Sequence, residues 1–432
     1  MSIPLDRLYT FLNNVSDHAL LIYGWQTHGS KKLRDLQPWI EFPKDWQVRK
    51  TQPALIFHDQ EPLDYDFSQQ CVNQEFCDAV GDWKNFSWWT QPNMQRVCKN
   101  MHFRSVVEQT LYDQILLVHS EKNSSQVEKY QQNNFATVYY WSHALISRDW
   151  FRFAQHDPEL KIKSPDSKLF LVYNRAWAGT REYRLKFAEQ LIAENLQGYC
   201  NIGFSKFDNQ VCYQDHVFSN PDFEISHTWL EKILPVNNHD SAASADYNSN
   251  DYQHSLIEVV LETLFDDSRH HLTEKALRPI ACGQPFILAA TAGSLAYLKE
   301  YGFKTFHGHI DETYDTIQDP KDRLAAIVQE MKRISSLSES ARQQLVNGVQ
   351  AATEHNQKLF FSDQFHHQVI SEFQQNLDQA VADVKNGPVG GCWTQVKSAA
   401  YEHDPETFLD FLEIDQHGVD WINTWIAENS KL

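Results

Sequence analysis

The 432-residue chain contains no run of eighteen apolar residues, so the sequence predicts no membrane-spanning helix. Its seven cysteines include no C-x-x-C pair, and we interpret them as reduced thiols rather than as a zinc site or a disulfide framework. Residues 1–17 have neither the basic segment nor the apolar segment of a secretory signal. Together these absences favour a cytoplasmic protein.

Several catalytic motifs and an excess of positive charge are also missing. The chain has no G-x-S-x-G, no phosphate-binding loop and no G-x-G-x-x-G, which removes support for the hydrolase and nucleotide-binding classes that these motifs mark. Lysine and arginine number 38 against 57 acids, and the net charge of -19 argues against a protein whose whole surface binds a polyanion. A local basic pocket remains compatible with this charge.

Apolar residues are abundant, at 42% of the chain with 13% aromatic, which excludes global disorder and allows two or three domains. In the first half, residues 19–23, 53–57 and 114–118 form continuous apolar runs, and each is followed by polar residues. Such runs separated by helical stretches indicate a parallel sheet that is covered on both faces. Ligands bind beyond the carboxyl ends of such strands, where the polar residues lie.

The second half also predicts an α/β domain, after a boundary near residues 155–168. The expected strands and helices are a strand at 169–173, a helix at 181–195, a strand within 255–265, a strand at 285–289 and helices from 324 to about 384. Residues 386–391 are rich in glycine and indicate a linker. The predicted organisation is therefore an α/β domain over 1–160, a second over 165–350 and a helical extension over 351–432.

The most informative segment begins at Thr273, which predicts a helix N-cap that is followed by Glu274 and Lys275. Pro279 implies that this helix is kinked there or starts just before it, and Gly283 should end it. At the edge of a sheet, the amides of the helix start and Lys275 could bind a nucleotide diphosphate, while Glu274 binds ribose hydroxyls. The alternative is a capped helix with a surface ion pair.

A second segment lies between a predicted strand and a predicted helix, which is the usual place of a phosphate-binding turn. It contains Asn174 and three arginines, Arg175, Arg181 and Arg184. Arginine forks match phosphate oxygens with two hydrogen bonds, so this local basic cluster is a candidate anion site. The alternative is that Arg181 and Arg184 pair with nearby acids on a solvated helix face.

A third candidate, Asp59 and Glu61, directly follows the apolar run at 53–57. A carboxylate there could accept a proton from an acceptor hydroxyl, although a loop of solvated acids is the alternative. Asp64 and Asp66 have the spacing of a metal-bridging D-x-D pair, which is a common pattern by chance.

Taken together and in order, these segments resemble the fucosyltransferase-like glycosyltransferases. The segment from Thr273 to Lys275, with its short helix and glycine, is similar to their donor-binding TEK motif. Residues 173–184 are similar to their arginine-bearing turn, and residues 56–61 resemble their strand that ends in a histidine-rich acidic motif. Residues 298–306 and 311–315 resemble glycosyltransferases of bacteriophage and bacterial genomes, whereas the chain beyond residue 386 lies outside the resemblance.

The resemblance implies a GT-B arrangement of two facing Rossmann-like domains, with the nucleotide sugar in the C-terminal domain and the acceptor in the N-terminal one. The expected reaction moves a hexosyl or pentosyl group from a nucleotide-diphosphate sugar to a hydroxyl, with inversion and without a metal or a further cofactor. Arg175, Arg184 and Lys275 would neutralise the departing diphosphate, and Glu61 or Asp59 would be the base. The donor site is expected to include, beside these cations, the residues Asn174, Arg181, Glu258, Glu262, Thr273 and Glu274.

Two other classes of function stay open. The chain could be a metal-dependent transferase or phosphate-ester enzyme built on Asp64 and Asp66, or a non-catalytic module that binds a sugar or a nucleotide. A glycan, a lipid-linked sugar or a modified nucleobase would each fit the expected reaction as acceptor.

Overall fold

The computed structural model describes residues 8, 11–12, 21–24, 54–66, 115–132, 135–208, 210–226, 230–235 and 244–386. Within these ranges the chain forms two compact units. Unit 1 comprises His143–Val369, and unit 2 comprises the described residues up to Ser142 together with those from Ile370 onward. Each unit has a parallel sheet with helices, which confirms the mixed α/β class.

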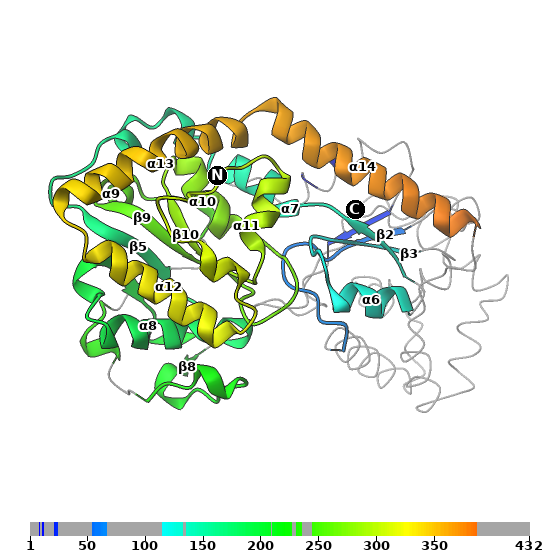
Figure 1. The fold of residues 1–432 in the computed structure, drawn as a ribbon. Coiled ribbons are helices and arrows are strands. Elements are labelled where there is room, and N and C mark those ends of the chain that lie inside the picture. The colour runs from blue at the N-terminus through cyan, green and yellow to red at the C-terminus, as the bar shows by residue number, and fades with distance from the viewer. Residues whose placement is uncertain are drawn as a thin grey trace, which may run out of the picture. The chain divides into compact units, whose positions relative to one another are not determined.

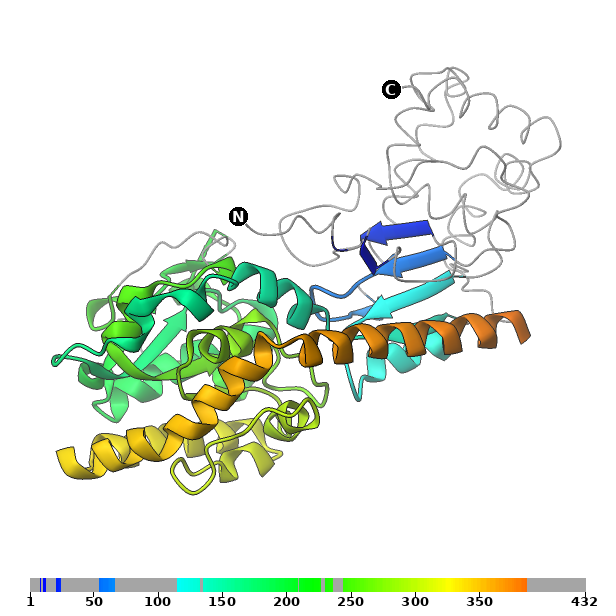
Figure 2. The ribbon, with the colours of Figure 1, turned by 90° about the horizontal axis from the view of Figure 1, so that it is seen from above.

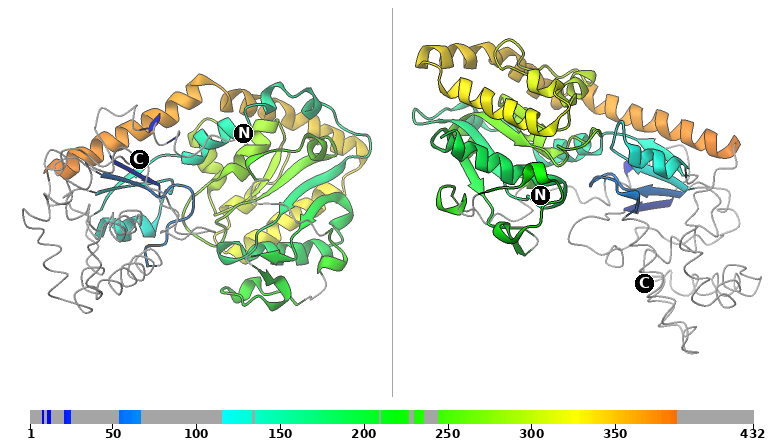
Figure 3. Two further views of the ribbon diagram at one scale, coloured as in Figure 1. Left: turned by 180° about the vertical axis from the view of Figure 1, so that it is seen from behind. Right: turned by 60° about the horizontal axis from the view of Figure 1, so that its bottom comes forward.

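Unit 1 is built on a four-stranded parallel sheet with the order β10-β9-β5-β6 (Figure 1). Its strands are β5 (Lys168–Asn174), β6 (Cys200–Phe204), β9 (Ser255–Leu261) and β10 (Phe286–Ala289). Most residues of β9 and all four of β10 are buried, as expected for a parallel sheet covered on both faces. The view from behind in Figure 3 shows these strands side by side.

Two pairs of helices cover this sheet on opposite faces (Figure 1). On one face α8 (Tyr183–Ala193) packs with α12 (Pro320–Ser335), and on the other α10 (Glu274–Cys282) packs with α13 (Glu339–Phe360). The chain runs outward from β5 to β6 in one direction and from β9 to β10 in the other. The neighbouring strands β5 and β9 therefore form a topological switch point, where the loops at the carboxyl ends diverge.

The limits of α10 follow from its sequence. The Thr273 hydroxyl accepts a hydrogen bond from the Lys275 N–H at 3.4 Å, and Gly283 ends the helix with a φ of 67°. That left-handed conformation is one that glycine adopts without a steric penalty. Both caps confirm the prediction. The predicted start just before Pro279 is wrong, because the helix begins at Glu274 and continues through the proline.

Shorter elements complete the unit. The helices α7 (Ser142–Trp150), α9 (Ser249–Gln253) and α11 (Ser294–Glu300) connect its parts, and β7 (Phe207–Asp208) pairs with β8 (Val211–Cys212) in an insert after β6. The 3-10 helices are η3 (Ala154–His156), η4 (Pro158–Lys161), η5 (Gly179–Arg181), η6 (Gln197–Tyr199), η7 (Tyr213–Asp215), η8 (Pro221–Phe223), η9 (Leu230–Lys232) and η11 (Thr313–Thr316).

Unit 2 contains a second parallel sheet, in the sequential order β1-β2-β3-β4 (Figure 2). Its strands are β1 (Leu21–Gly24), β2 (Ala54–Phe57), β3 (Ile115–His119) and β4 (Ala136–Tyr139). The helix α6 (Ser125–Gln132) connects β3 to β4. The strands expected at 19–23, 53–57 and 114–118 are thus confirmed.

The long helix α14 (Asp363–Asn386) begins in unit 1 and ends in unit 2. Within unit 2 the Asn376 amide donates to the Tyr139 carbonyl at 2.7 Å, and the Phe373 ring lies 5.2 Å from that of Tyr140. Together with α12 and α13, this helix confirms the helical character predicted from residue 324 onward.

The sequence predicted that the chain has no membrane-spanning helix and that its cysteines are reduced. None of the helices that the structure describes combines the length and the apolar character needed to cross a membrane. The three described cysteines, Cys200, Cys212 and Cys282, are free thiols. The other four cysteines and the chain from residue 387 lie outside the described residues.

Candidate functional site

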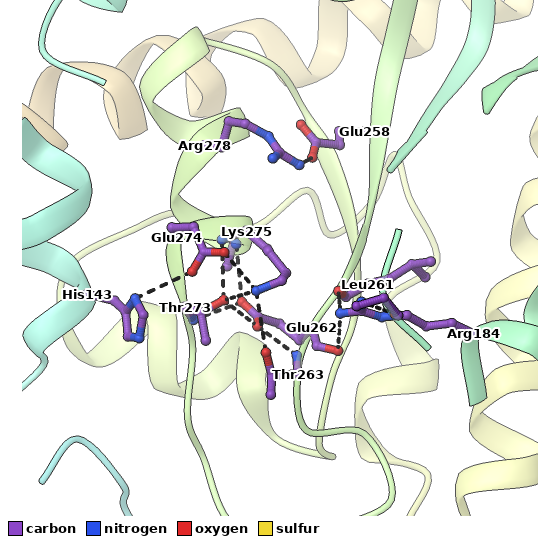
Figure 4. Close-up of polar contacts among 12 residues, drawn as sticks. His143, Arg184, Glu258, Leu261, Glu262, Thr263, Thr273, Glu274, Lys275 and Arg278 are labelled. Atoms are coloured by element: carbon purple, nitrogen blue, oxygen red, sulfur yellow. Dashed lines mark hydrogen bonds and ion pairs between the residues drawn. The ribbon is translucent and has the colours of Figure 1, made fainter. Parts of the chain in front are cut away.

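The arginine-bearing segment and the Thr-Glu-Lys segment lie together at the switch point of unit 1. The first follows β5 and the second follows β9, the neighbouring strand. The Arg184 guanidinium donates to the carbonyls of Leu261 and Glu262 at 2.6 and 3.0 Å (Figure 4). The Tyr183 hydroxyl also donates to the Glu262 carbonyl, at 2.7 Å. We call residues 174–184 and 262–276 the switch-point site.

The buried Arg184 side chain connects the arginine-bearing segment to the end of β9. It is 2% exposed, and a further hydrogen bond of 2.5 Å reaches the Ala176 carbonyl. Burial lowers the pKa of this guanidinium from its usual value, with the neighbouring Tyr183 opposing the shift. The Asn174 amide adds a hydrogen bond of 3.0 Å to the Arg184 carbonyl. Both side chains are thus engaged with the main chain through the atoms named here.

Arg175 has a different environment from Arg184. It is half-buried, and within the described ranges it makes no hydrogen bond or ion pair. The loop that carries Arg175 is bound to the β7–β8 insert. There the Asp208 carboxylate accepts hydrogen bonds from the N–H groups of Trp177 and Ala178, both at 2.7 Å. The Trp177 indole also donates to the Ser205 carbonyl at 2.9 Å. A loop held by three hydrogen bonds therefore carries a guanidinium that has no ion-pair partner among the described residues.

Glu262 directly follows β9 and is fully buried, with 0% of its surface exposed. Its Oε1 accepts from the N–H groups of Thr273 and Ala276 at 2.9 and 3.2 Å. Its Oε2 accepts from the Thr273 hydroxyl at 2.8 Å and from the Thr263 N–H at 3.0 Å. This carboxylate, which the sequence predicted to line the donor pocket, therefore binds the start of α10 (Figure 4).

Lys275 and Glu274 form an ion pair of 2.8 Å at the same helix start. The Lys275 ammonium also lies 3.1 Å from the Thr273 hydroxyl and 3.4 Å from that of Thr263, and its side chain is 21% exposed. Glu274 is buried, and its other oxygen lies 3.5 Å from Nδ1 of His143. Burial disfavours its charge, but Lys275 and His143 more than offset this and lower the pKa of Glu274. Lys275 is thus the more accessible member of the pair.

Glu258 lies further back in β9 and is separate from this group (Figure 4). It is fully buried, and it accepts from the Arg278 guanidinium at 2.7 Å and from the Tyr252 hydroxyl at 2.5 Å. The same guanidinium stacks 4.2 Å above the ring of Tyr173. This buried pair joins α10 and α9 to the sheet, so Glu258 supports the helix.

The acidic segment of unit 2 follows β2. Asp59 is 0% exposed, its carboxylate accepts a hydrogen bond from the Tyr140 hydroxyl, and its carbonyl accepts from the hydroxyls of Ser120 and Ser142 at 2.8 and 2.7 Å. Glu61 is only half-buried. The two candidate bases therefore differ in access: Asp59 anchors the loop and Glu61 lies nearer the surface.

Polar residues at and after the end of β3 also bind the loop that follows β2. The Glu121 carboxylate accepts from the Leu63 N–H at 2.6 Å and from the Ser124 hydroxyl. Nδ1 of His119 accepts from the Glu121 N–H at 3.3 Å, and burial lowers the pKa of His119 to about 3. The sequence analysis assigned no role to these residues. Their position directly after an apolar strand was the available signal, whereas nothing in the local sequence pointed to His143.

The D-x-D pair does not form a metal centre with its described neighbours. Asp66 is exposed and pairs with the Lys129 ammonium at 2.6 Å. Across the residues that the structure describes, no three histidine, cysteine or acidic side chains are grouped so as to hold a metal ion.

No protein-family model and no curated protein matches this chain. Among solved structures, it is similar to α,α-trehalose-6-phosphate synthase from Burkholderia multivorans, with a TM-score of 0.34 and 12% sequence identity. The aligned region covers 77% of this chain and 67% of that one.

Proposed function

We propose that the chain is a nucleotide-sugar-dependent glycosyltransferase with two Rossmann-like units of the GT-B type, which transfers a sugar to an acceptor hydroxyl. The observation that supports this most is the position of the switch-point site. Two basic segments, from separate parts of the sequence, lie at the carboxyl ends of β5 and β9. In open α/β sheets this is where phosphate-bearing ligands bind.

The donor site follows from the environment of each side chain. Lys275 and Arg175, with Arg181 on the same turn, contact the diphosphate, because they are the cations of the site that retain exposed surface. Glu274, held ionised, accepts hydrogen bonds from ribose hydroxyls. Buried Asn174, Arg184, Glu262 and Thr273 keep the two loops in place. Glu258 supports α10 from the interior.

The chemistry requires stabilisation of the leaving diphosphate and removal of a proton from the acceptor. Side-chain cations stabilise negative charge that develops on a leaving group without any need for a metal ion. Glu61 takes the proton of the attacking hydroxyl, and attack from the face opposite the diphosphate inverts the anomeric carbon. A glycan, a lipid-linked sugar or a modified nucleobase can each supply this hydroxyl.

The first test is a thermal-shift screen with UDP-, GDP-, ADP- and dTDP-sugars, since a ligand that binds only the folded state raises the Tm. For the sugar nucleotide with the largest shift, calorimetry then compares the wild type with Lys275→Ala. Charge-assisted contacts are worth roughly 1.5–3 kcal/mol, so the Kd should rise about ten- to a hundredfold.

Lys332→Ala is the matched control, because Lys332 pairs with Glu194 on the surface of unit 1, and its Kd should equal that of the wild type. An unchanged Kd in Lys275→Ala would remove the donor site from α10. If none of the four nucleotides binds the wild type, the proposed function itself is wrong.

A further inference from the structure

The N–H groups at the start of a helix usually have no partner in the helix, and they attract phosphate or other anions. In α10 three of these groups have partners within the protein. The N–H groups of Thr273 and Ala276 donate to the Glu262 carboxylate, and that of Lys275 donates to the Thr273 hydroxyl. Most of the anion-binding capacity of this helix start is therefore already taken up by Glu262 and Thr273.

Glu262 is also connected to Lys275 through one hydroxyl group. The Thr273 hydroxyl donates its single proton to Glu262 at 2.8 Å, so its lone pairs remain to accept from the Lys275 ammonium at 3.1 Å. Glu262 is fully buried and Thr273 is 2% exposed, which shields this connection from water. The orientation of the hydroxyl, and through it the position of the ammonium, thus depends on the Glu262 carboxylate.

We propose that Glu262 is the resident anion of the α10 start and the positioning residue of Lys275, so that side-chain cations, and not helix amides, hold the donor diphosphate. The inference rests on the proposed function where it concerns the diphosphate. The positioning of Lys275 is a property of the ligand-free protein, and it can be measured without any nucleotide.

The ligand-free measurement uses Glu262→Gln, which keeps the size of the side chain and removes its charge. Reductive methylation with formaldehyde, followed by mass spectrometry of the peptides, gives the labelling rate of Lys275. The amide has a single acceptor oxygen, so it cannot accept both from the N–H groups that bind Oε1 and from the Thr273 hydroxyl that binds Oε2. The hydroxyl then loses its orientation and the ammonium is less firmly held, so we expect labelling to become several-fold faster. A rate equal to that of the wild type overturns the proposal.

The second measurement is a double-mutant cycle on the Kd of the sugar nucleotide identified in the thermal-shift screen. Glu262→Gln should raise the Kd about tenfold, since roughly one charge-assisted contact is weakened. Combined with Lys275→Ala, it should add nothing to the effect of Lys275→Ala alone, because Glu262 acts through Lys275. Independent, multiplying effects on the Kd overturn the proposal.

Glu258→Gln is the matched control, since Glu258 is in the same strand, is equally buried and is bonded to Arg278 instead. It should lower the Tm without changing the labelling of Lys275. If it accelerates labelling as much as Glu262→Gln does, general loosening explains the effect and the proposal is wrong.

Should Glu262→Gln not fold, Thr273→Val and Thr273→Ser replace it. Valine removes the connecting hydroxyl and should accelerate the labelling of Lys275, whereas serine keeps the hydroxyl and should preserve the wild-type rate. Equal rates in these two variants overturn the proposal. Failure of all four nucleotides to bind rejects the proposed function, and the labelling rates still decide whether Glu262 positions Lys275.

Discussion

At the residue scale, Asp59 and Glu61 lie two positions apart and have opposite environments. Asp59 is fully buried and accepts from Tyr140, while Glu61 is half-buried in the same loop. A general base has to come within hydrogen-bond reach of the proton that it removes. The exposed surface of Glu61 therefore supports its assignment as the base, and Asp59 holds the loop that carries it.

We predict that Glu61→Gln lowers the transfer rate by about 10²–10⁴ while the Kd of the donor stays unchanged. Asp59→Asn should lower the rate less, because the amide oxygen of asparagine still accepts from Tyr140. Initial rates at saturating donor, together with calorimetric Kd values, measure both effects. Glu128→Gln, an exposed acid of α6, is the control and should behave as wild type.

The opposite order of the two rates would assign the base to Asp59. If neither substitution slows transfer, an inverting mechanism with an enzymic base is wrong for this chain, and a retaining mechanism takes its place.

His119 leads to a prediction about pH. Its pKa in the folded chain is about 3, against an ordinary value of 6.5, because it is buried. Between these two values the unfolded chain binds a proton that the folded chain does not, so this residue lowers stability as the pH falls from about 6.5 towards 3.

We expect the free energy of unfolding of the wild type to lose up to about 1.4 kcal/mol per pH unit from this residue in that range. His119→Asn should flatten the dependence, since asparagine does not titrate and its oxygen can still accept from the Glu121 N–H. Urea unfolding at several pH values between 4 and 7 measures the difference in slope. Parallel curves for the two proteins would show that His119 does not titrate as described.

At the scale of elements, the turn between β5 and α8 contains two arginines with different surroundings. Arg184 donates to three carbonyls of the turn and of β9, whereas Arg175 makes no polar contact with the described residues. Removing a buried group that satisfies several acceptors destabilises a protein, but removing an exposed charge has little effect on stability.

We predict that Arg184→Met lowers the free energy of unfolding by about 2–4 kcal/mol, because the carbonyls of Ala176 and Leu261 lose their donor. Arg175→Met should change it by less than about 0.5 kcal/mol and should weaken binding of the sugar nucleotide about tenfold. Thermal unfolding and calorimetry on the same preparations check both effects. If Arg184→Met is as stable as the wild type, the two segments are not held together as described.

At the scale of the whole molecule, the chain combines a net charge of -19 with a site that contains several cations. The cations come from turns at the ends of parallel strands, so their local density does not depend on the overall charge. This arrangement can stabilise a diphosphate leaving group without a metal ion.

We therefore predict that sugar transfer persists in excess EDTA at the rate measured without it. Comparing initial rates with EDTA, with added Mn²⁺ and with neither is the measurement. The paired substitution Asp64→Asn with Asp66→Asn should leave the rate unchanged. Activity that disappears in EDTA, returns with Mn²⁺ and is lost in this variant would support the D-x-D mechanism instead.

Much of the fold could be predicted, because strands and helix ends are marked by residues that are close together in the sequence. Apolar runs marked β2, β3, β5 and β10, and the capping residues Thr273 and Gly283 marked the two ends of α10. The strand β4 was missed, since its four residues form no continuous apolar run. Of the two alternatives that Pro279 left open, a start just before it is wrong, because α10 begins at Glu274 and contains the proline.

The sequence by itself determined the α/β class, the segments in which the charged residues lie and the approximate limits of several strands and helices, since all of these depend on short-range periodicity and capping. Only the tertiary structure decided which charge has which partner. Arg184 bonds to the Leu261 carbonyl 77 positions away, Glu262 to the N–H of Ala276, and Tyr140 to Asp59 81 positions away. Contacts between distant positions follow from strand order and sheet register, and these arise from the packing of the whole chain.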